Sequence, residues 1–439
     1  MSLHIKRSIE MELKKLSPGM MIAISFLLVI LTGAIVLKLP ISLNDGVEVS
    51  FIDTLFTSTS AVCVTGLIAV DTAETFNVFG RSVVALLIQV GGLGVTSIGV
   101  SIILVAGKRI SFKQRHLVKE AWNVNTFKGI VKLVKAVLIL TLSFELIGAI
   151  LSFFAFRKYY PTVDAIGISV FHSIAAFNNS GFDILGGLQN LIPYKNDVLL
   201  NLTTCGLIIF GGLGFLVIID VIKSKSIKKL SLHSKVVLIM TLILLVLGTL
   251  FLKSTENITW LGAFFQSTSA RTAGFSTYPI GEFTDAGLFV LIALMFVGAS
   301  PGSTGGGIKT STLFVLIQAV RSVVTNQDCE SFKRKIPYEA VSRAFIVTLL
   351  SLTVVIFGTF LLCILEPEYS FIQNLFETTS AFGTVGLSTG ITPFLSGISK
   401  FVIIIIMYIG RLGPLSIASL CFIRESSNVH YVEEMISIG

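Results

Sequence analysis

Four short stretches of the sequence end in a single glycine and carry residue types that suit the coordination of a cation. Each is rich in Ser, Thr and Phe, and in each the glycine is followed by Leu or Phe. They read FIDTLFTSTSAVCVTGL (51–67), VFHSIAAFNNSGF (170–182), AFFQSTSARTAGF (263–275) and LFETTSAFGTVGL (375–387). Internal repetition identifies structural units that are used together. We call these stretches the Gly-ended segments.

The residues at the end of each Gly-ended segment predict a ring of backbone oxygens. A dehydrated cation needs such a ring in place of its water, and backbone carbonyls can supply it. Glycine adopts the unusual φ and ψ angles that turn successive carbonyls inward without steric cost. One such glycine would indicate only a tight turn or close helix packing, but four in equivalent places favour a pore. The predicted coordinating residues, none of them charged, are Val64, Thr65, Gly66, Asn179, Ser180, Gly181, Thr272, Ala273, Gly274, Thr384, Val385 and Gly386.

The composition places these segments in an integral membrane protein. Of the 439 residues, 53% are hydrophobic and 13% are charged, whereas a soluble domain has about 25% charged residues. Eight apolar stretches are long enough to cross a bilayer, which takes about 20 residues each. They lie near 18–40, 81–106, 131–156, 198–222, 233–252, 283–320, 343–365 and 399–423. One Gly-ended segment separates the two spans of each successive pair.

Each Gly-ended segment has about ten residues before its glycine, which is too short to cross a bilayer at about 1.5 Å per residue. We expect it to enter the membrane from one side and turn back. Non-helical backbone survives at membrane depth only when it is buried in protein or lines a wet cavity. The predicted fold is therefore an all-α integral membrane protein with four tandem span–re-entrant pore loop–span repeats and pseudo-four-fold symmetry around a central ion pore. The negative end of each short helix would face the cation.

Charge predicts the orientation of the repeats. The connectors without a Gly-ended segment are basic, as at 108–135 and 223–235, and the others are neutral or acidic. By the positive-inside rule, both termini and the basic connectors lie in the cytoplasm. The net charge of +8 then reflects topology and contact with membrane lipids rather than nucleic acid. The predicted units are an N-terminal segment 1–17, repeats 18–107, 108–222, 223–320 and 321–425, and a tail 426–439.

The sixth span contains GASPGSTGGGIK at 298–309. In a helix interior each Gly costs about 1 kcal/mol and each Pro about 3 kcal/mol, so we expect a loop at membrane depth, just inside the Gly-ended segments. The run departs from a phosphate-binding loop, because Ile308 precedes Lys309 and the run lies within an apolar span. Lys309 and Arg411 are the two cations predicted within spans, and a buried charge in a membrane is a functional candidate. Glu145 is an acid within a span, for which we expect a polar partner in its own repeat.

Four span–half-span–span units with one glycine per loop resemble the Trk/Ktr/HKT superfamily of cation transporters. The resemblance covers essentially the whole chain from residue 18 onward and is to the Ktr type, which has no extra leading spans. It implies K⁺ uptake across a bacterial plasma membrane. A Ser at the first filter position accompanies sodium preference in the plant relatives, and Gly66 stands there in this sequence, which favours K⁺. Since each segment has one glycine, we expect a loose filter that tolerates Na⁺ or Rb⁺.

The resemblance also implies a gate and partners. The loop in the sixth span, with Gly302, Gly305, Gly306, Gly307 and Lys309, would lie under the filter and gate it. Arg411 would bond the carbonyls of this loop as part of the barrier to ions; the alternative is that it braces helix ends. The expected partners are a second copy in a homodimer and a separate cytoplasmic ring of nucleotide-binding regulatory subunits (KtrA/KtrC-like). No covalent cofactor and no enzyme activity are expected. A gated, channel-like pore, dependent on or stimulated by Na⁺, is the leading mechanism, and a Na⁺- or H⁺-coupled symporter is the alternative.

Overall fold

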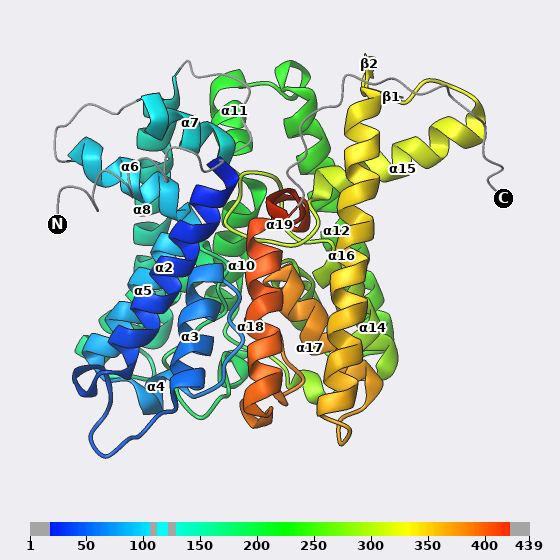
Figure 1. Cartoon of the computed structure of the whole chain (residues 1–439). Helices are drawn as coiled ribbons and strands as arrows, with labels where there is room; N and C mark the ends of the chain where they lie inside the picture. The colour runs from blue at the N-terminus through cyan, green and yellow to red at the C-terminus, as the bar shows by residue number, and fades with distance from the viewer. Residues whose placement is uncertain (1–17, 106–111, 122–128, 422–439) are drawn as a thin grey trace, which may run out of the picture.

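The computed structural model describes residues 18–105, 112–121 and 129–421, and these are mostly helical (Figure 1). The predicted N-terminal segment 1–17 and tail 426–439 lie outside the described residues. Each of the four repeats begins with a long apolar helix of a length that can span a membrane. These first helices are α2 (Pro18–Lys38), α8 (Ile130–Phe156), α12 (Leu232–Thr255) and α16 (Tyr338–Leu365).

A short helix follows each first helix and ends just before the glycine of a Gly-ended segment. These short helices are α3 (Phe51–Cys63), α9 (Thr162–Phe177), α13 (Trp260–Ser269) and α17 (Phe371–Gly383). The second helices of the repeats come in two parts, α5 (Val78–Leu93) with α6 (Val95–Val105), α10 (Val198–Leu213) with α11 (Phe215–Ser224), α14 (Asp285–Phe296) with α15 (Thr310–Thr325), and α18 (Gly397–Leu412) with α19 (Pro414–Cys421). The structure thus has the predicted all-α architecture of four pore-loop repeats.

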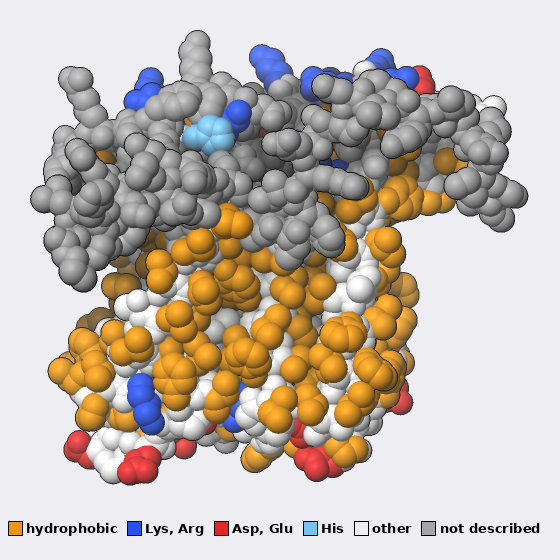
Figure 2. Space-filling model, viewed as in Figure 1, with side chains coloured by type: hydrophobic (Ala, Val, Ile, Leu, Met, Phe, Trp, Pro, Cys, Tyr) orange, Lys and Arg blue, Asp and Glu red, His pale blue; other side chains and the backbone are white. Residues whose placement is uncertain are grey.

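The remaining elements are connectors. At the end of the molecule that carries α7 they are α7 (Phe112–Ala121), η3 (Ile227–Lys229) and a hairpin of β1 (Glu330–Ser331) antiparallel to β2 (Arg334–Lys335). At the opposite end they are η1 (Pro40–Ser42), α4 (Thr72–Thr75), η2 (Ile192–Tyr194), η4 (Ile280–Glu282) and η5 (Thr392–Phe394). Between the two ends, hydrophobic side chains cover the outside of the molecule (Figure 2). An apolar belt of this kind faces lipid in a multi-pass membrane protein.

A glycine in each first helix lets the short helix of the same repeat approach closely. The Cβ position of this glycine lies against a hydroxyl-bearing side chain of the short helix. The pairs are Gly33 with Ser58, Gly148 with Ser173, Gly248 with Ser267, and Gly358 with Thr378. In the first three repeats the Ser hydroxyl also donates to the carbonyl three residues before that glycine, over 2.7, 2.6 and 3.1 Å. The same contact at the same place in four repeats gives the fold its pseudo-symmetry.

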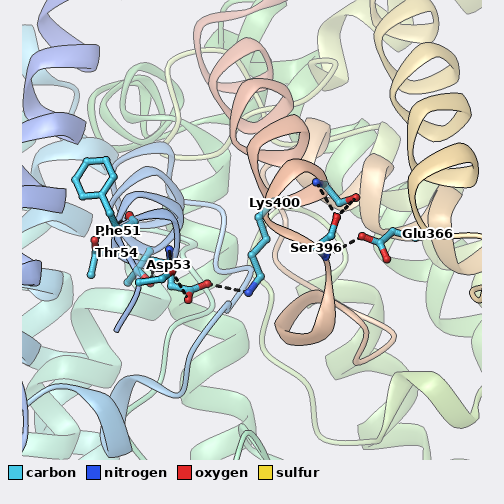
Figure 3. A network of polar contacts seen from close by, with 9 residues as sticks. Phe51, Asp53, Thr54, Glu366, Ser396 and Lys400 are labelled. Carbon is cyan, nitrogen blue, oxygen red and sulfur yellow. Dashed lines mark hydrogen bonds and ion pairs between the residues drawn. The ribbon is translucent and has the colours of Figure 1, made fainter. Parts of the chain in front are cut away.

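The second helix of each repeat contacts the short helix of the next, so the repeats form a ring. The contacting pairs are α5 with α9, α10 with α13, α14 with α17, and α18 with α3. The last pair joins the two ends of the sequence. There Lys400 Nζ of α18 lies 2.8 Å from Asp53 Oδ1 of α3, with both side chains largely buried. Figure 3 shows Lys400 reaching toward Asp53, while Glu366 accepts from the backbone amide of Ser396.

The predicted spans at 81–106, 198–222 and 399–423 are not single straight helices. Helix α5 meets α6 at a bend of 97°, and α10 meets α11 at 93°. The breaks fall at Gly94, Gly214 and Gly413, which have φ of 83°, 89° and 87°. Such angles are open to glycine and interrupt the helical hydrogen bonds. The second span of each repeat is therefore broken, and the break in the third repeat, between α14 and α15, is the longest.

Candidate functional site: a central ion path

The four Gly-ended segments meet at the centre of the ring. Their glycines have φ between 69° and 92°. The Cβ position of each lies against the carbonyl oxygen of the residue that precedes the next glycine around the ring, so a methyl group there would overlap that oxygen. The contacts run from Gly66 to Ser180, from Gly181 to Ala273, from Gly274 to Val385, and from Gly386 back to Thr65. All twelve predicted coordinating residues are buried in this closed ring of backbone.

Backbone hydrogen bonds hold the turn that ends each short helix. The amides of Thr65, Ser180 and Val385 donate to the carbonyls five residues earlier, over 2.8, 2.9 and 2.9 Å. In the third repeat, Ala273 donates to Ser269, four residues earlier, over 2.8 Å. The third segment is one residue shorter at this point, and the shorter turn absorbs the difference. Its glycine therefore still reaches the ring, although the four walls are not identical.

A non-glycine residue in the left-handed region occurs two positions before each glycine. These residues are Val64, Asn179, Thr272 and Thr384, with φ of 57°, 58°, 86° and 49°. Each costs about 1–2 kcal/mol for an L-residue, so the surrounding structure must enforce it. The left-handed turn directs the chain from the helix into an extended return stretch.

Polar side chains of the short helices hold the return stretches, and the sequence prediction missed them. Glu377 is fully buried and accepts from Ser388 Oγ at 2.8 Å, from the Thr389 amide at 2.8 Å, and from Thr392 Oγ1 at 2.6 Å. Gln266, at the equivalent place in the third repeat, bonds Ser276 Oγ over 3.0 Å. The signal was present, since the corresponding positions of all four apolar half-spans hold a polar residue: Thr57, His172, Gln266 and Glu377.

A cavity of about 300 Å³ lies on the side of the glycine ring away from α7 and α15, which we call the outer side, and the opposite side is called the inner side. Gly66, Gly274 and Gly386 form part of its wall. The return stretches and the loops after them form the rest of the wall. The ring is therefore reached from this side through a vestibule.

On the inner side, residues 297–309 separate α14 from α15 and form the loop predicted in the sixth span. The loop is bonded to two other repeats. Its Ser300 amide donates to Gly212 O over 3.1 Å, and the Phe215 amide donates to Gly302 O over 3.1 Å. At its other end, the Gly306 amide donates to Thr384 Oγ1 over 2.9 Å. The loop thus crosses beneath the ring from the second repeat to the fourth.

Both predicted intramembrane cations bind this loop. Lys309 Nζ donates to the carbonyls of Gly305 at 2.7 Å and Gly306 at 3.3 Å. Arg411 donates through Nη1 to Thr304 O of the loop and through Nη2 to Gly91 O of α5. The guanidinium therefore joins the fourth repeat to the loop and to the first repeat. The loop and Arg411 together contact all four repeats.

Two buried cations lie beyond the predicted pair. Lys400 is within α18 and pairs with Asp53, so the interpretation that only Lys309 and Arg411 lie within spans was wrong. Arg271 is 6% exposed and lies two residues before Ala273 in the third Gly-ended segment. Its Nε has no hydrogen-bond partner among the described residues. The expected partner of Glu145 is confirmed: Asn178 Nδ2, in the same repeat, donates to it over 3.1 Å.

Comparison with known proteins identifies the class of protein to which the chain belongs. The model of the TrkH family, described as cation transport protein, matches residues 6–431. This is nearly the whole chain, and the chain belongs to this family of membrane cation transport proteins. A solved structure, that of the potassium transporter TrkH from Vibrio parahaemolyticus, superposes with a TM-score of 0.72 over 93% of this chain and 86% of that one. At 18% identity the likeness shows that the fold is shared.

Curated relatives match at higher identity and over their full length. The Ktr system potassium uptake protein B of Bacillus subtilis is 39% identical over 97% of both chains. The potassium/sodium uptake protein NtpJ of Enterococcus hirae is 38% identical over 97% of this chain and 98% of its own. The Ktr system potassium uptake protein D of Bacillus subtilis is also 38% identical. The chain is thus similar to transporters of the Ktr type, as the sequence motifs predicted.

Proposed function

We propose that this chain is the membrane subunit of a K⁺ uptake system and conducts K⁺ through a gated, channel-like pore. The observation that carries the proposal is the closed ring of the four Gly-ended segments. In it, a backbone carbonyl oxygen of each repeat lies against the glycine of a neighbouring repeat, and backbone carbonyls in a ring can replace the water of a dehydrated cation. The short helices end at this ring, so their negative dipole ends also favour a cation there.

The choice of K⁺ rests on the relatives and on the first segment. The Bacillus subtilis relatives are named potassium uptake proteins, and Gly66 stands at the first filter position. Because each segment has one glycine, discrimination against Na⁺ is expected to be modest. One relative is named for uptake of both potassium and sodium, which supports tolerance of Na⁺. Dependence on Na⁺, or stimulation by it, is a further part of the proposal.

The inner loop and Arg411 are the proposed gate. Residues 298–309 lie across the inner side of the ring, and the Arg411 guanidinium adds a positive charge that repels an approaching cation. Movement of the loop would have to break its bonds to Thr384 and Arg411. Gly302, Gly305, Gly306, Gly307 and Lys309 are the loop residues to which we assign gating.

The assembly follows the Ktr pattern in this proposal. The names of the relatives as members of a Ktr system support a separate regulatory component, which we take to be a cytoplasmic ring of nucleotide-binding subunits. A homodimer in the bacterial plasma membrane, with both termini in the cytoplasm, is part of the same proposal. The basic connectors support that orientation.

Complementation tests the pore. Wild type should restore growth at low K⁺ to a bacterial strain that lacks K⁺ uptake, and Gly66→Ser should lower the preference for K⁺ over Na⁺. Gly46→Ser is the matched control, because Gly46 also has positive φ, at 77°, but has nothing within 4 Å of its Cβ position. If wild type does not restore growth when its regulatory subunits are supplied, the proposal is contradicted.

Current–voltage measurements separate a channel from a symporter. In liposomes with independent K⁺, Na⁺ and H⁺ gradients, the current through a channel reverses at a potential set by the permeant ions, close to the K⁺ Nernst potential. A symporter shifts its reversal potential with the gradient of the coupling ion at fixed K⁺. A shift of that kind with Na⁺ or H⁺ would replace the channel mechanism by the coupled one.

A further inference from the structure

The outer vestibule contains one buried carboxylate directly beyond the glycine ring. The second residue after each of the four glycines lines the 300 Å³ cavity. These residues are Ile68, Asp183, Ser276 and Ser388. One level of the ion path thus has a side chain from every repeat, but only the second repeat supplies a negative charge.

Only one of the two carboxylate oxygens of Asp183 accepts a hydrogen bond from the described residues, so the other can bind a ligand. The side chain is 8% exposed, and its Oδ1 accepts from the Leu185 amide at 3.0 Å. Its Oδ2 accepts no hydrogen bond from residues 18–105, 112–121 and 129–421. The nearby Tyr194 hydroxyl is bonded to Tyr160, over 2.8 Å, rather than to Asp183. A buried carboxylate oxygen without a donor is costly unless a cation or water satisfies it.

The surroundings of Asp183 increase its negative potential. Asp71 of the first repeat is within coulombic range of it, and the oxygens of Asp71 accept from the amides of Ala73, Glu74 and Leu188. Asn190 ties this wall to its neighbours, since Nδ2 donates to Gly181 O at 3.2 Å and Oδ1 accepts from the Ser276 amide at 3.2 Å. These bonds join the segment that carries Asp183 to the third repeat.

We propose that Asp183 forms an outer binding site for a partly hydrated K⁺ ion at the entrance of the pore. The inference rests on the proposed function, since it assigns to the vestibule the ion that the glycine ring conducts. A carboxylate oxygen is a hard ligand that suits such an ion. The ion keeps part of its water at this site and exchanges the rest for carbonyl oxygens one step further in. The site raises the local K⁺ concentration at the ring and does not set selectivity.

The test is the concentration dependence of uptake in Asp183→Asn. Asn retains the acceptor for the Leu185 amide and removes only the charge. One unit charge at a few ångströms in a water-like medium contributes about 1 kcal/mol, so the half-saturating K⁺ concentration should rise about fivefold. The maximal rate and the preference for K⁺ over Na⁺ should stay close to wild type. Asp45→Asn, the same change at an exposed residue on the same side of the molecule, should leave the half-saturating concentration unchanged.

Ionic strength distinguishes a site from general attraction by surface charge. Glu282 is an exposed acid on the wall of the same cavity. Choline chloride at 0.3 M shortens the Debye length below about 10 Å and should remove any effect of Glu282→Gln. The effect of Asp183→Asn should persist. An unchanged half-saturating concentration, an equal effect of the two variants, or loss of the Asp183 effect in choline chloride would each overturn the proposal.

Chemical restoration of charge keeps the test valid if Asp183→Asn does not fold. Asp183→Cys treated with a sulfonatoethyl thiosulfonate regains a negative charge and should return toward the wild-type half-saturating concentration. Treatment with the trimethylammonium-ethyl reagent should raise that concentration further, and identically treated wild type is the control. Equal responses to both reagents would contradict the site. Failure of wild-type K⁺ uptake, or unchanged selectivity in Gly66→Ser, would instead contradict the proposed function itself.

Discussion

The glycine ring and the inner loop are built from the same four repeats in different ways. At the ring, each repeat supplies a turn with the same φ signs and a glycine against its neighbour's carbonyl. At the inner loop, one repeat supplies an insertion and another supplies Arg411, whereas the other two supply carbonyl acceptors. Coordination of an ion needs oxygens on all sides, but obstruction of a path needs one barrier. The ring must therefore keep four-fold symmetry, and the barrier need not.

The largest expected effect follows from this symmetry at the ring. Gly386→Ala would place a methyl group on the Thr65 carbonyl, and since that contact joins the last repeat to the first, K⁺ uptake should fall more than tenfold and its preference for K⁺ over Na⁺ should be lowered, as in Gly66→Ser. Gly390→Ala is the matched control. Gly390 also has positive φ, at 96°, but no atom within 4 Å of its Cβ position, so only backbone strain of about 1–2 kcal/mol is added. Equal loss in both variants would show that strain, rather than the ring contact, is responsible.

The second largest effect is expected at the contact that closes the ring of repeats. It concerns the stability of the protein rather than its ion flux. Asp53→Asn leaves Lys400 unpaired in a largely buried site, and removal of one partner of a buried pair costs about 3–5 kcal/mol. The melting temperature of the purified protein should fall accordingly. The exposed pair Lys335–Asp328 has the same 2.8 Å separation, so Asp328→Asn is the control and should change little, as surface pairs contribute about 0–1 kcal/mol.

The reciprocal exchange isolates the pairing. Asp53→Lys combined with Lys400→Asp restores opposite charges across the joint between α3 and α18, and it should recover part of the lost melting temperature. If each single variant melts at the same temperature as wild type, the ion pair does not stabilise the closed ring. The covalent connections and apolar contacts would then hold the last repeat against the first.

The sequence predicted the ring because its requirements are local. A glycine after a short polar helix can be recognised in each repeat, and four copies identify a common role. The loop at 298–309 was equally visible, since five glycines and Pro301 fall within twelve residues. The hydrogen bonds that hold this loop could not be predicted, because a bond such as that from Gly306 to Thr384 joins positions far apart in the chain.

The broken second spans and the additional buried charges could not be predicted on the same basis. One Gly in an apolar run costs a helix about 1 kcal/mol, which is too little to distinguish a break at Gly214 from a continuous span. That break depends on a neighbour, because the Phe215 amide donates to Gly302 O of another repeat. Lys400 likewise stands near the end of its span, and its partner Asp53 lies 347 residues away. Pairing over that distance depends on how the ring closes.

Removal of the charge from the barrier should increase flux. Arg411→Ala deletes the bonds to Thr304 O and Gly91 O together with a positive charge beside the proposed path. A change of about 1.4 kcal/mol, which is within the range of such an interaction, corresponds to a rate about tenfold higher. Tracer ⁸⁶Rb⁺ uptake at equal expression measures it. Arg411→Lys keeps the charge but cannot donate to both carbonyls from separate nitrogens. Its flux should lie between those of wild type and Arg411→Ala. Unchanged or lower flux in Arg411→Ala would favour the alternative in which Arg411 only braces helix ends.

The smallest expected effect concerns the bond from the Gly306 amide of the loop to Thr384 of the ring. Thr384→Val removes the acceptor of the Gly306 amide and keeps the shape of the side chain. Val64 occupies the equivalent position of the first segment with similar φ, so the ring itself tolerates Val there. A net hydrogen bond contributes about 1 kcal/mol, and its loss should favour the displaced loop and raise basal flux about fivefold.

Thr65→Val is the matched control for this bond. Its buried hydroxyl has no hydrogen-bond partner among the described residues, so its removal should leave flux near wild type. Ion preference should be unchanged in Thr384→Val, because no carbonyl of the ring is altered. A change in preference with no change in flux would mean that this hydroxyl shapes the ring rather than holding the loop. Thr384 would then belong to the symmetric ring, and the one-sided barrier would begin on the inner side of this residue.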